Sequence, residues 1–323
     1  MTLKLMPAAK VSCALLCLAL MHSEAYAATA NDQYAKGMKL EGTGRYADAL
    51  NLMLKAANEG SARAQNEVGR LYFAGMGIRR DDAEALRWFR KSADQGFAEG
   101  QENVGLSYSF GWGVAKDEAA SLKWFRMAAV QGLVDAQENV ATSYFYGWGT
   151  AKDEVEALKW FRMAADQGYA KAQNNLGSAY LNGQGIAVDY AEAQKWFRKA
   201  ADQGLAIAQN NLGTIYLNGW GVAQDNAEAL TWIRKAAYQG LAQAENNLGT
   251  LYLNGVGVER NYGEALKLFR MAASQGLSSA QHNVGWIYAN GFGVQKNEAE
   301  AARWYRMAEE HGKAQTLQTA MGG

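Results

Sequence analysis

Cysteine, proline and histidine are scarce in this chain of 323 residues, which contains two, one and three of them. Both cysteines, Cys13 and Cys17, and the only proline, Pro7, lie within the first 27 residues. Without that segment the chain has no thiol for a disulfide, a thiolate metal ligand or a nucleophile. The remaining histidines, His282 and His311, fall in different parts of the sequence. We therefore expect no zinc site, no other metal and no cofactor.

The chain also lacks an excess of charge of either sign, with 32 basic and 32 acidic residues. A balanced surface gives no electrostatic reason to expect nucleic acid or an anionic membrane as a partner. The apolar run from Val11 to Met21 is eleven residues long, which is too short to cross a bilayer. The sequence therefore predicts neither a nucleic-acid partner nor a membrane span.

The first 27 residues have the organisation of a secretory signal peptide. Lys4 and Lys10 form a basic start, the apolar run follows, and the sequence Ala-Tyr-Ala at residues 25–27 supplies a cleavage site with small residues. Cleavage after Ala27 would leave residues 28–323 as an exported protein, either periplasmic or secreted.

What the sequence does contain is a repeat of 36 residues. An apolar residue recurs on this spacing at Trp88, Trp124, Trp160, Trp196, Trp232, Leu268 and Trp304. A glycine recurs at Gly60, Gly96, Gly132, Gly168, Gly204, Gly240, Gly276 and Gly312. A Gly-x-Gly pair begins at Gly75, Gly111, Gly147, Gly183, Gly219, Gly255 and Gly291. Fixed spacing over seven or eight units indicates a solenoid, in which each unit buries its apolar face against its neighbours.

Each unit contains a first amphipathic helix. In the first full unit, Ala64, Val68 and Leu71 lie on one face of a helix that ends at Gly75. Gly69 interrupts this apolar stripe, where glycine costs roughly 1 kcal/mol relative to alanine. The same glycine returns in every later unit except one, which has alanine. We infer that another helix packs too closely at this position for a larger side chain.

A seven-residue loop leads to the second helix of each unit. Asp81 is placed to accept hydrogen bonds from the amides of the first turn, with Glu84 three residues later. Ala85, Trp88 and Phe89 then form the buried stripe. Each unit is therefore predicted to be a helix hairpin with one large aromatic side chain in its core, and the fold to be all-α.

Two motifs carry a resemblance to a known family. The runs Ala-Gln-x-Asn-Leu-Gly-x-x-Tyr-x-x-Gly-x-Gly-Val and Glu-Ala-x-x-Trp-Phe-Arg-x-Ala-Ala-x-Gln-Gly are nearly complete in residues 172–204 and 208–240. On these motifs the unit resembles the Sel1-like repeat, a longer relative of the tetratricopeptide repeat. The resemblance implies an α/α superhelical solenoid of Sel1-like helix hairpins.

The repeat divides the sequence into four predicted segments. These are a signal peptide at residues 1–27, a divergent tetratricopeptide-like capping repeat at 28–60, seven Sel1-like repeats at 61–312, and a truncated C-terminal capping helix at 313–323. Atypical end units are expected because a stacked array must cover its two exposed end faces.

Three columns of asparagine are the candidate partner-binding residues. The first stands two positions before the helix glycine, at Asn103, Asn139, Asn175, Asn211, Asn247 and Asn283. The second directly precedes it, at Asn174, Asn210 and Asn246, and the third lies at Asn182, Asn218, Asn254 and Asn290. In tetratricopeptide proteins, asparagines at similar positions line the concave face and hold a peptide backbone, so the resemblance implies the same role here. The alternative is that these amides bond neighbouring repeats or helix ends.

Two further columns lie outside the predicted core. The residue between the paired glycines is large and apolar at Trp112, Trp148, Trp220 and Phe292, which predicts either an exposed ridge for a partner or a lid over its own hairpin. An arginine follows each aromatic pair, at Arg90, Arg126, Arg162, Arg198, Arg234, Arg270 and Arg306. We expect these arginines to cover aromatic faces or to bond carbonyls of the first helix, with carboxylate capture as the alternative.

The resemblance implies an exported, non-enzymatic adaptor that binds an extended peptide or a protein on the concave face of the first helices. The alternative is a protein that binds cell-wall glycan or interacts with β-lactams, because some exported relatives have been described as penicillin-binding proteins or β-lactamases. This chain departs from those relatives in lacking the repeat cysteines and any Ser-x-x-Lys motif. No catalytic residue is therefore predicted, and the partner and the oligomeric state are left open.

Overall fold

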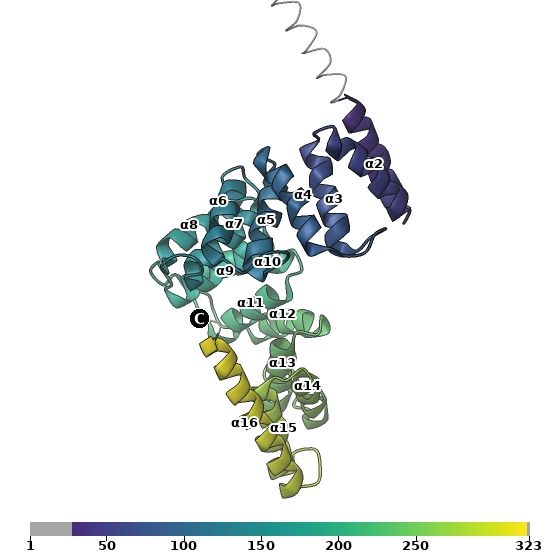
Figure 1. Ribbon diagram of the computed structural model, residues 1–323. Coiled ribbons are helices and arrows are strands. Elements are labelled where there is room, and N and C mark those ends of the chain that lie inside the picture. Colours follow the sequence, from purple (N-terminus) through teal and green to yellow (C-terminus); the bar gives the residue numbers. More distant parts are fainter. Residues whose placement is uncertain (1–27, 322–323) are drawn as a thin grey trace, which may run out of the picture. The chain divides into compact units, whose positions relative to one another are not determined.

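The computed structural model describes the backbone of residues 28–321 and the side chains of residues 28–313 (Figure 1). The predicted signal peptide at residues 1–27 lies outside the described residues. Across the described range the backbone forms helices joined by turns, without a β-strand, which confirms the predicted all-α fold. No helix in this range is both long enough and apolar enough to cross a membrane.

The chain divides into two compact units, Met1–Lys152 and Asp153–Gly323. In unit 1 a helix over residues 28–41 precedes α2 (Tyr46–Asn58), α3 (Ala62–Ala74), α4 (Asp82–Asp94), α5 (Ala98–Phe110), α6 (Glu118–Ala129) and α7 (Val134–Tyr146). Unit 2 contains α8 (Glu154–Asp166), α9 (Ala170–Asn182), α10 (Tyr190–Asp202), α11 (Ala206–Asn218), α12 (Asn226–Tyr238), α13 (Ala242–Asn254), α14 (Tyr262–Ser274), α15 (Ser278–Asn290) and α16 (Glu298–Met321).

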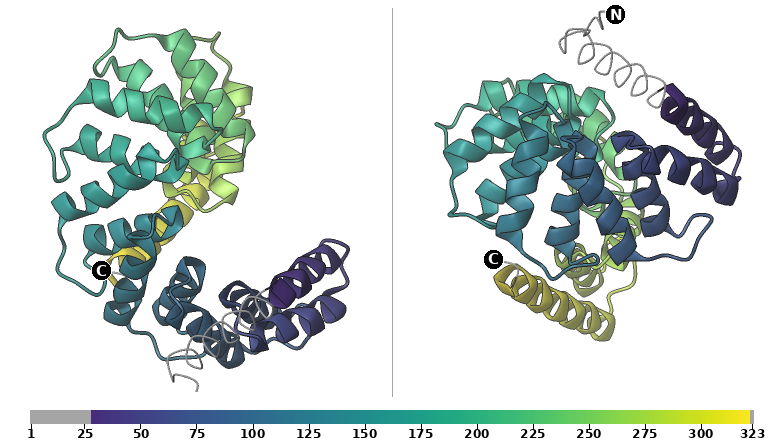
Figure 2. Two further views of the ribbon diagram at one scale, coloured as in Figure 1. Left: turned by 90° about the horizontal axis from the view of Figure 1, so that it is seen from above. Right: turned by 45° about the horizontal axis from the view of Figure 1, so that its top comes forward.

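The helices alternate between two kinds. From α3 to α15 the odd-numbered helices are the first helix of each repeat, called helix A below, and the even-numbered helices that follow are helix B. Within each unit, consecutive helices pack side by side in chain order (Figure 2). The predicted helix hairpin is therefore the structural module of both units.

Local sequence fixes where each helix begins and ends. Helix B starts at an aspartate or asparagine, and in α12 Asp225 Oδ1 accepts hydrogen bonds from the amides of Ala227 and Glu228 at 3.0 Å. Helix A ends at a glycine in the left-handed region, as at Gly219 with a φ of 66°. These caps satisfy backbone groups that have no partner inside the helix, and they confirm the predicted helix boundaries.

The core of each hairpin lies where helix B places two adjacent large apolar side chains against helix A. Trp196 and Phe197 of α10 are buried against α9. A Cβ atom added at Gly177 of α9 would lie 2.8 Å from Cδ1 of Phe197, closer than real Cβ contacts. The helix glycine is thus required by the close approach of the aromatic ring, as the repeat pattern indicated.

The Gly-x-Gly loop joins one repeat to the repeat before it. A Cβ atom at Gly257 would lie 2.4 Å from the carbonyl oxygen of Asn226, at the start of the preceding helix B. Gly257 also has a φ of 68°, which favours glycine. The second glycine of the pair therefore allows the loop to touch the first turn of the neighbouring hairpin.

The C-terminal end differs from the prediction. The sequence predicts a separate capping helix at residues 313–323, after Gly312. Instead α16 continues through Gly312 as one helix, Glu298–Met321. A glycine inside a helix weakens it without ending it, because only a turn to the left-handed region or a lost hydrogen bond stops the helix. Residues 313–321 therefore extend the last helix B.

We expect Gly213→Ala to lower the free energy of unfolding by about 1–3 kcal/mol. The new methyl group would lie 2.5 Å from Cγ1 of Ile233 and 3.0 Å from the carbonyl oxygen of Ala229. Gly263→Ala is the matched control, because its nearest neighbour would be Asn261 Oδ1 at 3.4 Å. That variant should gain up to about 1 kcal/mol from helix propensity. Urea unfolding measures both, and equal stabilisation of the two variants would contradict tight packing at Gly213.

Candidate interaction surface

The first two asparagine columns bond to each other between neighbouring repeats. Asn211 Nδ2 on α11 donates a hydrogen bond of 3.0 Å to Asn174 Oδ1 on α9. The acceptor Asn174 is buried, whereas Asn211 is half-buried. Bonds of the same type, each 2.8 Å long, join Asn103 to Asn66, Asn247 to Asn210 and Asn283 to Asn246. These amides therefore bond neighbouring repeats, which was the alternative to partner binding. A role of Asn103, Asn211, Asn247 or Asn283 in partner binding stays a prediction.

In unit 1 glutamate replaces the acceptor asparagine, at Glu102 and Glu138. Asn139 Nδ2 donates to Glu102 Oε1 over 3.4 Å, a weak bond by its length. Burial raises the pKa of Glu102 to about 7, and the negative charges of Asp135 and Glu99 add to the rise. The ladder is therefore neutral in unit 2 and carries an ionisable carboxyl group in unit 1. Asn175, the first-column residue of α9, is half-buried.

The third asparagine column lies on the surface. Its members are the last residues of their helices and all are exposed: Asn182, Asn218, Asn254 and Asn290. Asn218 Nδ2 donates to the carbonyl oxygen of Thr214 at 2.9 Å, one turn back on the same helix. Among the described residues this column makes no hydrogen bond between repeats. Of the three columns, it is the one that the fold leaves accessible to a partner.

A ladder of glutamines, which was not among the predicted site residues, runs beside the asparagines. Gln173 Nε2 on α9 donates to the carbonyl oxygen of Ala165 at 3.1 Å, and Gln173 Oε1 accepts from Nε2 of Gln203, the C-cap of α10, at 2.8 Å. Equivalent helix-A positions are Gln65, Gln101, Gln209 and, with a carboxylate in place of the amide, Glu245. The 36-residue recurrence of both glutamines was the available signal. These buried amides bond the last turn of one hairpin to the next.

The histidines occupy defined places in this framework. His311 replaces the helix-B glutamine in the last repeat, and its Nδ1 lies 3.0 Å from Gln281 Oε1. His311 is exposed and takes part in the glutamine ladder at the same time. His282 packs on Tyr305, with ring centroids 5.0 Å apart. Among the described side chains, no group of three or more histidines, cysteines, aspartates and glutamates is arranged to hold a metal ion.

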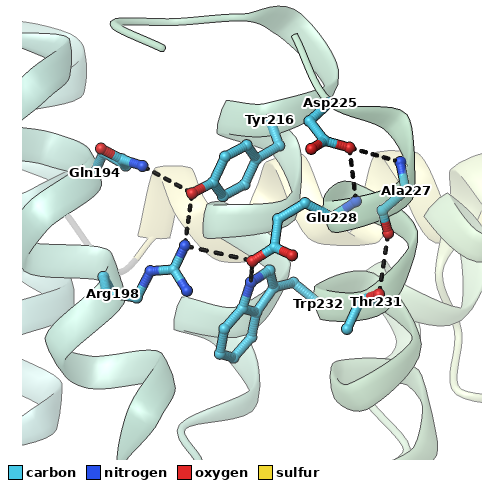
Figure 3. A network of polar contacts seen from close by, with 8 residues as sticks. All are labelled: Gln194, Arg198, Tyr216, Asp225, Ala227, Glu228, Thr231 and Trp232. Carbon is cyan, nitrogen blue, oxygen red and sulfur yellow. Dashed lines mark hydrogen bonds and ion pairs between the residues drawn. The ribbon is translucent and has the colours of Figure 1, made fainter. Parts of the chain in front are cut away.

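In the arginine column, Arg198 joins three helices of two consecutive repeats (Figure 3). Arg198 on α10 donates to the Tyr216 hydroxyl on α11 at 2.5 Å and lies 3.4 Å from Glu228 Oε1 on α12. Gln194 Nε2 donates to the same hydroxyl at 2.9 Å, and Trp232 Nε1 donates to Glu228 at 2.8 Å. The arginine therefore fixes the stacking of hairpins.

This network corrects one expectation and confirms another. The arginines were expected to bond carbonyls of helix A, but those from Arg90 to Arg270 donate instead to a tyrosine hydroxyl on the next helix A. The expected coverage of aromatic faces is confirmed, because the Arg198 guanidinium lies 5.1 Å from the ring centroid of Trp232. Carboxylates do enter the network, as internal partners such as Glu228.

The residues between paired glycines are partly covered by other aromatic rings. Trp112 is half-buried, with ring centroids 4.5 Å from Phe73 and 4.8 Å from Phe110. Trp148 stacks on Tyr146 at 4.9 Å and is 37% exposed. In unit 2 the stacked pairs are Tyr190 with Trp220 and Tyr262 with Phe292. The ridge thus consists of aromatic pairs with one face covered, and its use by a partner stays a prediction.

These features define a class of protein, an all-α array of helix hairpins held by polar ladders between repeats. The Sel1 repeat family model matches eight segments: residues 23–61, 62–97, 98–133, 134–169, 170–205, 206–241, 242–277 and 278–313. The chain belongs to the Sel1 repeat family, as the resemblance implied. The first match covers most of the segment that we expected to be a tetratricopeptide-like cap.

Solved structures of Sel1 repeat proteins share this fold. The chain is 38% identical to c5321, described as a protective antigen of uropathogenic Escherichia coli strains displaying an SLR fold, with a TM-score of 0.74. That match covers 81% of this chain and 56% of c5321, so it spans little more than half of the relative. A Sel1 repeat protein from Oxalobacter formigenes is 32% identical, with a TM-score of 0.70, over 75% of this chain and 96% of that one. No curated protein matches the chain.

We expect Asn211→Ala to lower the free energy of unfolding by about 1–3 kcal/mol, because it leaves the buried Asn174 carbonyl without its donor. Asn218→Ala removes an exposed amide from the same helix and should change stability by less than about 0.5 kcal/mol. Thermal or urea unfolding of the two variants makes the comparison. Equal losses would show that the bond between repeats contributes nothing specific.

We expect Glu102→Gln to stabilise the protein increasingly as the pH rises. The pKa of Glu102 is raised from 4.5 to about 7 in the folded state, so the stability that it confers is fully present below pH 4.5 and is lost as the pH rises through 7. The variant should therefore exceed the wild type by about 3 kcal/mol at pH 8 and match it at pH 4. Urea unfolding at both pH values tests this, with exposed Glu259→Gln as the control. A pH-independent difference would refute the assignment.

Proposed function

We propose that this chain is an exported, non-enzymatic scaffold that holds protein or extended peptide partners along its helix-A faces. Membership of the Sel1 repeat family supports the scaffold role, since proteins built from these repeats generally serve as platforms for protein interaction. Export rests on the basic start, apolar run and cleavage site in residues 1–27. The exported protein therefore binds its partner outside the cytoplasm.

The observation that carries this proposal is the accessible asparagine column of unit 2. Asn182, Asn218, Asn254 and Asn290 end four consecutive A helices and stay exposed, whereas the neighbouring amide columns are engaged between repeats. A carboxamide offers both donors and acceptors, which suits it to hold the main chain of a peptide whatever its sequence. A regular row of such groups fits an extended ligand better than a compact one.

The triple variant Asn182→Ala, Asn218→Ala, Asn254→Ala should reduce partner capture at least fivefold while the melting temperature stays within about 2 °C of the wild type. Capture is measured by crosslinking in intact cells, affinity purification and quantitative mass spectrometry. Replacement of the exposed helix-B residues Asp202, Thr231 and Ser274 by alanine is the control. Undiminished capture by the asparagine variant would refute the proposed role of this column.

A further inference from the structure

The helix-A face of unit 1 differs in charge from that of unit 2. Four carboxylates lie on its last two A helices, Glu99 and Glu102 on α5 and Asp135 and Glu138 on α7. The same columns of unit 2 contain amides, hydroxyls and single residues of other kinds: Lys171, Asn174, Ile207, Asn210, Gln243, Asn246, Ser279 and His282. Both charges that act on Glu102 are negative, and with burial they raise its pKa. This part of unit 1 is therefore a concentrated negative patch.

The other end of the same helices is aromatic. Phe110 on α5 is 54% exposed and Tyr146 on α7 is 58% exposed, at positions where unit 2 has asparagine. Each stacks on the tryptophan of its own Gly-x-Gly loop, Phe110 on Trp112 at 4.8 Å and Tyr146 on Trp148 at 4.9 Å. Large exposed aromatic side chains are typical of interaction sites on soluble proteins.

A cavity of about 90 Å³ opens between the acidic and aromatic ends. Leu106, Phe110, Thr142 and Trp148 line it from α5, α7 and the loop that follows α7. Asn139, which donates to Glu102, also lines it, so the carboxylate lies beside the cavity.

The cavity has an identifiable cause, because Ser109 also lines it. In the preceding repeat the equivalent residue is Phe73, whose ring packs 4.5 Å from Trp112. Later repeats have Phe145, Leu181, Leu217 and Leu253 at this position, and the last repeat has Ala289. The small serine thus leaves space beside Trp148 that a large side chain occupies in five of the other repeats, from Phe73 to Leu253.

We propose that this α5–α7 face, defined by Glu99, Glu102, Asp135, Leu106, Ser109 and Trp148, binds an extended basic segment of a partner protein. Lysine or arginine side chains of the segment lie against the carboxylates, and one aliphatic side chain enters the cavity. The inference rests on the proposed scaffold function and names the kind of segment that unit 1 accepts.

The volume of the cavity and the spacing of side chains along α5 both favour an extended segment with basic and aliphatic residues. A cavity of about 150 Å³ accommodates benzene, and the smaller one beside Trp148 has room for an aliphatic side chain. Alternate side chains of an extended chain are about 6.6 Å apart, close to the 5.4 Å rise of a helical turn. A segment with basic and aliphatic residues in alternation along one edge therefore matches Glu102 and Leu106, one turn apart on α5. A nucleic acid would be repelled by the same carboxylates.

The test uses three labelled eleven-residue peptides with the purified protein in fluorescence anisotropy. One carries lysine and leucine in turn at every second position, with serine between them, so that both kinds lie along one edge. The second has glutamate in place of lysine, and the third has serine in place of leucine. We expect the lysine–leucine peptide to bind at least tenfold more tightly than either other peptide. Its affinity should fall as salt rises from 50 to 300 mM, because exposed charges are screened.

Two sets of variants locate the binding. Ser109→Phe fills the cavity without changing charge, and the triple variant Glu99→Gln, Glu102→Gln, Asp135→Asn removes charge without changing the cavity. Each should weaken the lysine–leucine complex at least tenfold. Ser109→Leu, which introduces the residue of later repeats, replaces Ser109→Phe if circular dichroism shows that the phenylalanine variant does not fold.

The control for non-specific attraction removes three exposed carboxylates elsewhere, by Asp166→Asn, Asp202→Asn and Glu259→Gln. It should leave the affinity within twofold. An equal loss in this control, no loss in Ser109→Phe or Ser109→Leu, or no binding of the lysine–leucine peptide overturns the inference. If cellular capture of partners by the wild type persists in any of these cases, the proposed scaffold function stands and this assignment alone fails.

Discussion

The structure depends on one close contact, in which a large helix-B side chain packs directly on a glycine of helix A. Phe197 on Gly177 is the example in α9 and α10, and Ile233 plays the same part on Gly213. Because no Cβ intervenes, the two helices approach closely along a fixed line, and the rotation of each helix about its axis is determined. That rotation decides which helix-A residues face the next repeat and which face outward.

The polar ladders follow from this geometry. Once helix A is fixed, Gln173 reaches the last turn of the preceding helix B, and Asn174 meets an asparagine 37 residues further along the chain. The Arg198 network adds a third set of contacts between hairpins. Buried amides are costly when unpaired, so each repeat is specific for a neighbour that supplies the matching group. The side chains that remain for a ligand are those outside the ladders.

The side chains that lie outside the ladders differ between the two units. Unit 2 repeats an exposed asparagine at the end of each helix A, whereas α5 and α7 of unit 1 carry carboxylates at one end and aromatic rings at the other. The fold does not require particular residues at these positions, because their side chains take no part in the contact between the helix-A glycine and helix B. They are therefore free to be selected for binding, and a repeat scaffold can carry distinct surfaces on one framework.

The sequence alone determined the hairpin and its limits, since Asp225 as a cap and Gly219 as a stop act through local hydrogen bonds and backbone sterics. The need for small Gly213 was also readable from its recurrence. The sequence did not reveal which asparagines form hydrogen bonds between repeats, because Asn211 and Asn174 are brought together only when successive hairpins stack. The same holds for the cavity at Ser109, which forms where α5, α6, α7 and the Trp148 loop meet. Spacing along a chain fixes local structure, whereas the pairing of side chains far apart in sequence depends on packing in three dimensions.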